Sequence, residues 1–197
     1  MDVTPAQNPR RVRGNTAPIQ HWLTGIRERP LIHRAIVVAP ESLAAVRDLG
    51  GWIFDITAAG WQVAVVTPDL DHQNSLRILG VSALDLKQAL SKGIRTLEPD
   101  HLAVATELYN REEKLRDTVV RSLRQTDSVT TLWGSDLPSE LNGMATVRPH
   151  RPSSAALAFK TAAIHAAGYP DEISTTTETM WSPHKRALQT VPGRTHG

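Results

Sequence analysis

The chain has 197 residues, a length typical of a single domain, and it contains no cysteine. Without cysteine there is no disulfide framework, no thiolate nucleophile and no Cys-ligated zinc or iron–sulfur cluster. The net charge of +2 is unevenly distributed, because residues 1–30 and 148–197 each carry +3 whereas residues 31–147 carry −4. The sequence therefore predicts a mildly acidic core between two basic ends.

Neither end of the chain indicates export or membrane insertion. The basic residues near the N-terminus are not followed by the apolar segment of a secretory signal. No apolar run approaches the ~18 residues that a membrane span needs. We therefore expect a cytoplasmic protein that makes no membrane contact.

The most informative segment is residues 32–69, which is typical of a strand–helix–strand unit. Residues 35–39 and 63–66 are continuous apolar runs, as expected for strands buried on both faces of a parallel sheet. Apolar residues at helical spacing lie between them, and Ser42 is the expected N-cap of that helix. Such a unit forms a right-handed parallel crossover. The Gly50-Gly51 pair inside the helix indicates either close packing or a break.

The rest of the chain supplies further elements of the same kind. The pattern predicts short helices at 75–79 and 83–90, a long charged helix at 100–124 and a third strand at 129–133. A short edge strand at 145–147 follows.

An Ala-rich helix comes next, which starts at Ser153 or Ser154 and ends before Gly168. We expect a three-layer α/β domain at 19–169 with a short, mostly parallel sheet, either Rossmann-like or of a degenerate RecA-like form. Residues 1–18 are predicted to be a flexible basic arm, and residues 170–197 a flexible tail.

Acidic and polar residues follow the predicted strands. Asp69, Asp71 and Asp136 offer oxygen ligands that suit Mg²⁺, and His72 suits a general acid or base. Because ligands bind beyond the carboxyl ends of parallel strands, these four residues are the candidate catalytic set if the protein is an enzyme. The structural alternative is that they cap helices and close turns.

Several common signatures of chemistry are missing. The sequence has no G-x-x-x-x-G-K-[ST], no G-x-G-x-x-G and no G-x-S-x-G. The eight histidines are scattered without an H-x-x-x-H pair, which argues against a zinc site. We therefore expect no cofactor and no bound metal.

The basic ends suggest a partner. Arg10, Arg11 and Arg13 in the arm, with Lys185 and Arg186 in the tail, are candidate contacts to phosphates or to an acidic protein. The alternative is that these residues only keep the chain in solution. The oligomeric state is left open.

One segment resembles the start of a RecA-type core. The resemblance rests on Ala39-Pro40-Glu41-Ser42, a following helix, a strand that ends at Asp69, and Leu79-Gly80-Val81. That family continues with the Gly-Lys-Thr that binds nucleotide, where this chain has Leu43-Ala44-Ala45. The resemblance implies an ATP-independent relative, such as an accessory factor in DNA repair.

Residues 58–68 also resemble part of two other families. They are similar to the first half of two-domain glycosyltransferases and to the second motif of haloacid-dehalogenase-like phosphatases. The phosphatases require an Asp-x-Asp after an earlier strand, which this chain lacks. A short pattern shared by three families indicates an α/β architecture and no single activity.

The leading functional hypothesis is a non-catalytic binding or accessory protein that contacts nucleic acid or another protein. It rests on the degenerate phosphate-loop position, the missing catalytic signatures and the basic ends. The alternative is a small α/β enzyme acting on a phosphorylated or sugar-like substrate at the carboxyl-terminal edge of the sheet. A third possibility is a phage or plasmid assembly component.

Overall fold

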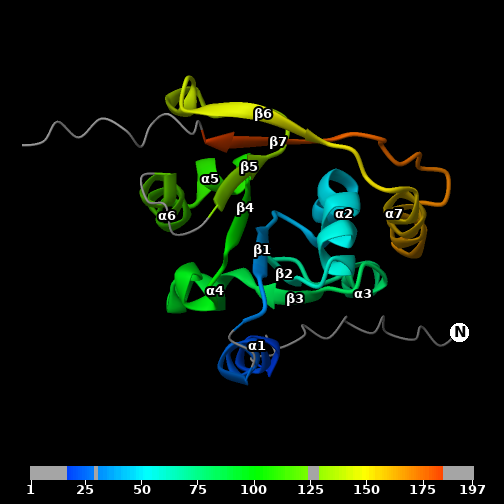
Figure 1. Cartoon of the computed structure of the whole chain (residues 1–197), viewed down its shortest axis with the longest axis horizontal. Helices are drawn as coiled ribbons and strands as arrows, with labels where there is room; N and C mark the ends of the chain where they lie inside the picture. The colour runs from blue at the N-terminus through cyan, green and yellow to red at the C-terminus, as the bar shows by residue number, and fades with distance from the viewer. Residues whose placement is uncertain (1–16, 29–30, 124–128, 184–197) are drawn as a thin grey trace, which may run out of the picture.

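The computed structural model describes residues 17–28, 31–123 and 129–183, which form one mixed sheet covered by helices on both faces (Figure 1). The seven strands are β1 (Arg34–Val38), β2 (Gln62–Thr67), β3 (Ser82–Asp85), β4 (His101–Ala105), β5 (Val129–Trp133), β6 (Ala145–His150) and β7 (Glu178–Pro183). Their order is β3-β2-β1-β4-β5-β7-β6. Strands β1 to β5 are parallel, whereas β7 runs antiparallel to β5 and to β6.

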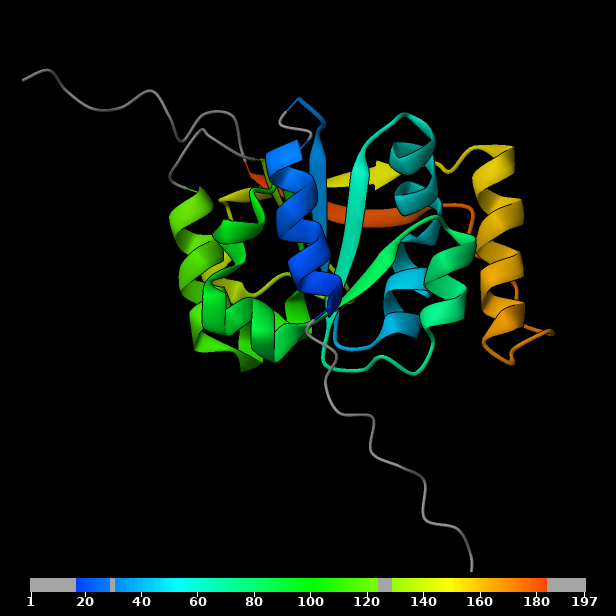
Figure 2. The same ribbon diagram turned by 90° about the horizontal axis from the view of Figure 1, so that it is seen from below.

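Seven α-helices and two short 3₁₀ helices connect the strands of the described chain. They are α1 (Ala17–Glu28), α2 (Ser42–Ala58), α3 (Gln73–Ile78), α4 (Leu86–Lys92), η1 (Ile94–Leu97), α5 (Thr106–Arg111), α6 (Glu113–Leu123), η2 (Ser139–Leu141) and α7 (Ser154–Ala166). Figure 2 shows α7 as the outermost helix on the side of α2 and α3, with α4 to α6 across the sheet.

The core consists of two apolar clusters, one on each face of the sheet. Alternation along β1 divides its side chains between them: Ile36 and Val38 belong to the cluster that includes residues of α1, α4, α5 and α6, whereas Ala35 and Val37 belong to that of α2, α3 and α7. All four are fully buried. The predicted mostly parallel sheet with both faces covered is confirmed, and the continuous apolar runs are its cause.

Several predicted elements match the structure. The apolar runs at 35–39, 63–66 and 129–133 correspond to β1, β2 and β5, and 145–147 lies in the edge strand β6. Ser153 caps α7, because its side chain accepts a hydrogen bond from the Ala156 N–H at 3.1 Å.

Residues 100–124 do not form the predicted long helix. His101–Ala105 is strand β4, which pairs in parallel with β1 and β5. The prediction was wrong because the charged pairs that favour a helix begin only at Glu107, which contacts Arg111 at 3.3 Å. The preceding His-Leu-Ala-Val-Ala stretch is instead buried between two strands, so tertiary pairing decides its conformation.

Two smaller predictions are corrected. The segment 83–90 divides into β3 and α4, and Asp85 caps α4 by accepting from the Gln88 N–H at 2.8 Å. Ser42 is not the N-cap of α2, because Glu41 occupies that position. The Ser42 hydroxyl instead donates to the carbonyl oxygen of Asp69 at 2.7 Å and links the ends of β1 and β2.

Regular structure extends past both predicted domain boundaries. Helix α1 begins at Ala17, inside the predicted arm, and β7 lies inside the predicted tail. Strand β7 sits between β5 and β6, with Glu178 and Met180 buried. Thr and Ser suit a strand as well as a loop, which is why composition did not reveal the strand at 178–183. Residues 1–16 and 184–197 lie outside the described chain.

None of the helices within the described residues has both the length and the apolar character that crossing a membrane requires.

Candidate active site

The sheet contains one topological switch point, between β1 and β4. The chain leaves β1 toward β2 on one side, and β4 lies against the other side of β1. Ligands of open α/β sheets bind beyond the carboxyl ends of the strands at such a point. A cavity of about 340 Å³ lies there, which we call the switch-point cleft. Its lining residues are Pro40, Ala44, Asp48, Ala105, Thr106, Glu107, Trp133, Gly134 and Ser135.

A tight contact between two turns forms one wall of the cleft. Gly134 follows β5 with φ of 129°, a conformation that L side chains rarely adopt. A Cβ atom there would lie 2.7 Å from the Thr106 Oγ1 atom at the end of β4. Glycine therefore allows the β5 turn to approach β4, and it places the hydroxyls of Thr106 and Ser135 on the same cavity.

Asp48 supplies a carboxyl group from helix α2 on another wall. Burial of the group raises its pKa above the ordinary value. The nearby positive charge of Lys160 lowers the pKa in part, and the negative charge of Glu178 raises it again. Asp48 as a whole residue is exposed, so its carboxyl is partly desolvated while it stays accessible from the cleft. A carboxyl with a raised pKa beside a cavity is a candidate general acid.

A buried ion pair lies behind Asp48. The Lys160 Nζ of α7 donates to the Glu178 Oε1 of β7 at 2.7 Å, and both side chains are fully buried. Lys160 also donates to the Thr175 hydroxyl at 3.1 Å. A buried pair is retained only where hydrogen bonds satisfy both partners, and Glu178 has further donors on the other side.

Those donors are backbone amides in the middle of α2. The N–H groups of Gly51 and Trp52 donate to Glu178 at 2.8 and 2.7 Å. A Cβ on Gly51 would lie 2.4 Å from Pro152, and one on Gly50 would lie 3.2 Å from the Lys160 side chain. The glycine pair therefore serves close packing, and it fixes the helix that carries Asp48 against α7 and β7.

The remaining cleft residues are polar or aromatic. Glu107 is exposed, and its carboxylate accepts a hydrogen bond from Arg111 at 3.3 Å. Trp133 is 1% exposed, and its indole Nε1 has no hydrogen-bond partner among the described residues. The cleft thus brings together two carboxyl groups, two hydroxyls and an aromatic wall.

The sequence-predicted set Asp69, Asp71, His72 and Asp136 is divided by the sheet. The first three lie in the loop after β2, whereas Asp136 follows β5, and β1 and β4 separate those strands. Three strand spacings amount to roughly 14 Å. The Asp69 Oδ1 accepts the Asp71 N–H at 2.9 Å, so it closes a turn. The structure does not gather the four residues; a catalytic role for them stays a prediction.

The donor set does not fit a metal centre. Across residues 17–28, 31–123 and 129–183, no group of three or more His, Asp or Glu side chains could hold a metal ion. In particular, Asp69, Asp71 and Asp136 do not form the Mg²⁺ site that their positions after the strands suggested. The described lining of the cleft has two carboxyl groups and no histidine.

Sequence reasoning missed Asp48, Lys160 and Glu178. Asp48 lies in the middle of the amphipathic helix α2, where an acidic residue usually indicates only the side of the helix that faces solvent. Lys160 is the only charged residue of the Ala-rich helix α7 at neutral pH. A single charge in such a helix is the sequence feature that could have identified it. The predicted contact residues Arg10, Arg11, Arg13, Lys185 and Arg186 all lie outside the described residues.

Comparisons with known proteins place the fold. No family model matches the sequence, and no curated protein matches it. A solved antimicrobial reagent A40926 pseudoaglycone deacetylase matches with a TM-score of 0.54 and 14% identity, over 76% of this chain and 96% of that one. A zinc-inhibited form of a teicoplanin deacetylase matches with a TM-score of 0.53 and 12% identity, over 78% and 99%.

A third structure is a 4-carboxy-2-hydroxymuconate hydratase from Pseudomonas putida. It matches with a TM-score of 0.52 and 13% identity, over 82% of this chain and all of that one. At these identities the matches establish a shared fold.

The fold therefore corrects the leading functional hypothesis. The three solved structures compared above are two deacetylases and a hydratase, which are enzymes. The interpretation as a non-catalytic accessory protein, with its RecA-like DNA-repair and nucleic-acid-binding roles, was wrong. It was inferred from missing signatures, and an absent motif does not exclude a catalytic arrangement that has no short motif.

Proposed function

We propose that the protein is an enzyme that acts on a sugar-like substrate in the switch-point cleft. The observation that carries the proposal is the position of Asp48, whose raised pKa coincides with a cavity at the β1–β4 switch point. The strand order β3-β2-β1-β4-β5 supports the Rossmann-like form of the predicted fold.

The neighbours suggest the type of reaction. Deacetylation and hydration both add the elements of water to a substrate, so each needs a base for the water and an acid at the other end of the reacting bond. Two carboxyl groups in different environments can divide these tasks. Asp48, with its raised pKa, suits the acid, and Glu107, which is exposed, suits the base. Thr106 and Ser135 would position substrate hydroxyls through hydrogen bonds.

The acid role of Asp48 depends on pH in a defined direction. A carboxyl with a raised pKa holds its proton to higher pH than an ordinary aspartate. Activity that requires the protonated form therefore falls as the pH rises through that pKa. The teicoplanin deacetylase structure is a zinc-inhibited form, but the described residues of this chain do not fit a zinc site, so no step of the proposal passes through a metal.

The test is release of acetate from N-acetylated amino-sugar glycosides by the full chain. Asp48→Asn and Glu107→Gln keep size and should each lower kcat/KM by roughly 10²–10⁴-fold, the usual contribution of an acid or base. Asp117→Asn changes an exposed acid on α6 and is the matched control, with activity expected to be unchanged.

Thermal melting of each variant separates loss of chemistry from loss of structure. The proposal fails if the full chain neither turns over nor binds any glycoside. It also fails if Asp48→Asn retains wild-type kcat/KM. If His72→Ala or Asp136→Asn abolishes turnover while both cleft variants remain active, the site is the set of acids and histidine that the sequence predicted.

A further inference from the structure

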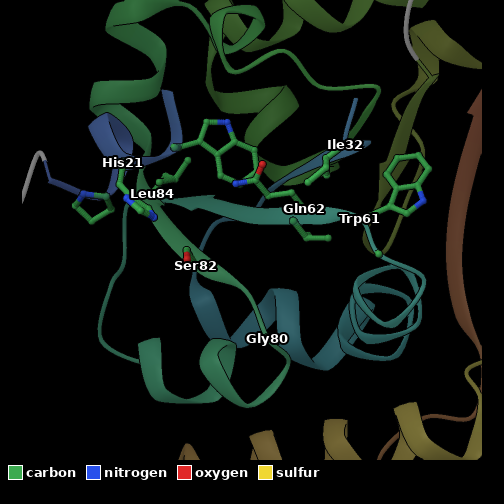
Figure 3. A pocket seen from close by; sticks show the side chains of 11 residues that line it. His21, Ile32, Trp61, Gln62, Gly80, Ser82 and Leu84 are labelled. Atoms are coloured by element: carbon green, nitrogen blue, oxygen red, sulfur yellow. The ribbon is translucent and has the colours of Figure 1, made fainter. Parts of the chain in front are cut away.

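A second cavity lies at the opposite edge of the sheet, at the amino ends of β2 and β3. Its volume is about 340 Å³, and we call it the amino-edge pocket (Figure 3). It is lined by Pro18, His21, Trp22, Ile32, Gly60, Trp61, Gln62, Val63, Gly80, Ser82 and Leu84. None of these residues takes part in the switch-point cleft, so the pocket is a separate candidate site.

Helix α1 forms one wall of the pocket and is held firmly in place. Ile19, Trp22 and Ile26 are buried in the apolar cluster on this face of the sheet. The Trp22 indole N–H donates to the Leu97 carbonyl oxygen at 3.2 Å. The turn before β2, at the other end of the pocket, is also fixed, because Trp61 stacks on His33 with ring centroids 4.9 Å apart. Because Trp22 is buried in the core, Trp61 is the indole ring that stays partly exposed on the pocket wall.

The polar groups of the pocket are uncharged amide and hydroxyl groups and one histidine. Among residues 17–28, 31–123 and 129–183, no Asp, Glu, Lys or Arg lines it. Figure 3 shows Gln62 between His21 and Trp61, with Ser82 on the neighbouring strand β3. The Gln62 Oε1 is buried and has no hydrogen-bond partner among the described residues. An unsatisfied buried acceptor is unfavourable, and a ligand donor would satisfy it.

We propose that the amino-edge pocket binds an uncharged planar heterocycle with neighbouring donor and acceptor groups, which is the chemistry of a nucleobase. A glutamine carboxamide presents a donor and an acceptor side by side and pairs with the matching edge of a base. The partly exposed Trp61 indole ring provides a platform on which a base can stack. The volume lies in the range of about 300–1,000 Å³ that small-molecule sites occupy. Because no Lys or Arg of the described part of the chain lines the pocket, a free base or nucleoside fits better than a nucleotide.

The test is calorimetric titration of the full chain with adenosine and with uridine, using adenosine monophosphate and methyl β-glucoside as comparison ligands. At least one nucleoside should bind, and its phosphorylated form should bind no more tightly. Backbone NMR shifts should then concentrate at the amino ends of β2 and β3. If neither nucleoside binds, or if only the glucoside does, the proposal is wrong.

Two variants place the binding in the pocket. Gln62→Leu removes the carboxamide at similar size and should weaken nucleoside binding at least tenfold. Ser82→Phe should block the pocket by filling it, while Ser139→Phe, at another exposed serine, should leave binding unchanged. Melting curves confirm that each variant is folded. Wild-type affinity in both Gln62→Leu and Ser82→Phe would overturn the proposal. Because neither residue lines the cleft, glycoside turnover should persist in both, so this test can fail independently of the proposed activity.

Discussion

Two acid-bearing regions at the carboxyl edge of the sheet differ in what surrounds their carboxyl groups. In the loop after β2, the Asp69 carboxylate accepts the Asp71 N–H, and the Asp69 N–H donates to the Thr67 hydroxyl at 3.2 Å. In the switch-point cleft, burial raises the pKa of Asp48 beside an open cavity. The carboxylate of Asp69 is thus occupied by the hydrogen bond that closes its turn. The carboxyl group of Asp48 on helix α2 remains available for proton transfer.

The largest effect is expected when the buried ion pair between Lys160 and Glu178, behind Asp48, is broken. Lys160→Met should lower the free energy of unfolding by about 3–5 kcal/mol, because Glu178 is left as a buried charge without its cation. Urea denaturation measures the change. The double variant Lys160→Met/Glu178→Gln removes both charges and should recover part of the loss. Equal stability of Lys160→Met and wild type would show that the pair does not hold α2 and its aspartate in place.

A second test uses the opposite end of strand β4, where burial lowers the pKa of His101 to about 4 from 6.5. A lowered folded-state pKa disfavours protonation, so stability is fully present above pH 6.5 and is lost as the pH falls toward 4. The loss is roughly 3 kcal/mol at 1.36 kcal/mol per pKa unit. His101→Gln should flatten this part of the pH–stability curve. The His101→Gln variant also separates the pH dependence of stability from the pH dependence of activity in the cleft.

A third test moves the helix that carries Asp48. Gly51→Ala places a Cβ 2.4 Å from Pro152 and should cost about 1–3 kcal/mol by overpacking. Gly50→Ala is the matched control, because its Cβ would lie 3.2 Å from the Lys160 Cγ and 3.5 Å from the Leu79 Cδ1, which are looser contacts than that of Gly51. Alanine is also the better helix former by ~1 kcal/mol, so this control should be close to neutral. If thermal melts rank the two variants in the reverse order, close packing is not the role of Gly51.

The smallest effect is expected in the loop after β2. Asp69→Ala removes one turn hydrogen bond and should cost about 0.5–1.5 kcal/mol in stability. Glycoside turnover per folded molecule should stay within about twofold of wild type, as expected for a group outside the chemistry. A loss as large as that of Asp48→Asn would remove the distinction between the two regions and restore the loop as a candidate site.

The parts of the fold that were predictable are those with a strong local signal. The apolar runs of β1, β2 and β5 and the Ser153 cap could be read directly, because burial on both faces and capping leave a local pattern. Strands β4 and β7 could not be predicted from the sequence. Each is specified by its neighbours in the sheet, and a charged helix or a Thr-rich loop is an equally good local interpretation.

The site was less predictable than the fold. Burial raises the pKa of Asp48, and the elements that pack beside it carry Lys160 and Glu178, which lie more than 100 residues further along the chain on α7 and β7. No window of sequence contains that contact. The residues that sequence did single out, Asp69 to His72, stand out because turns favour such side chains.

The position of β7 also constrains the order in which the chain can be completed during synthesis. Strand β6 pairs with β7 and not with β5, although it precedes β7 by 28 residues. Until residues 178–183 leave the ribosome, β6 has no place in the sheet, β5 remains an open edge, and Lys160 lacks its carboxylate. The half-made protein therefore exposes a strand edge of the kind that promotes aggregation, and truncation before residue 178 should yield insoluble chains.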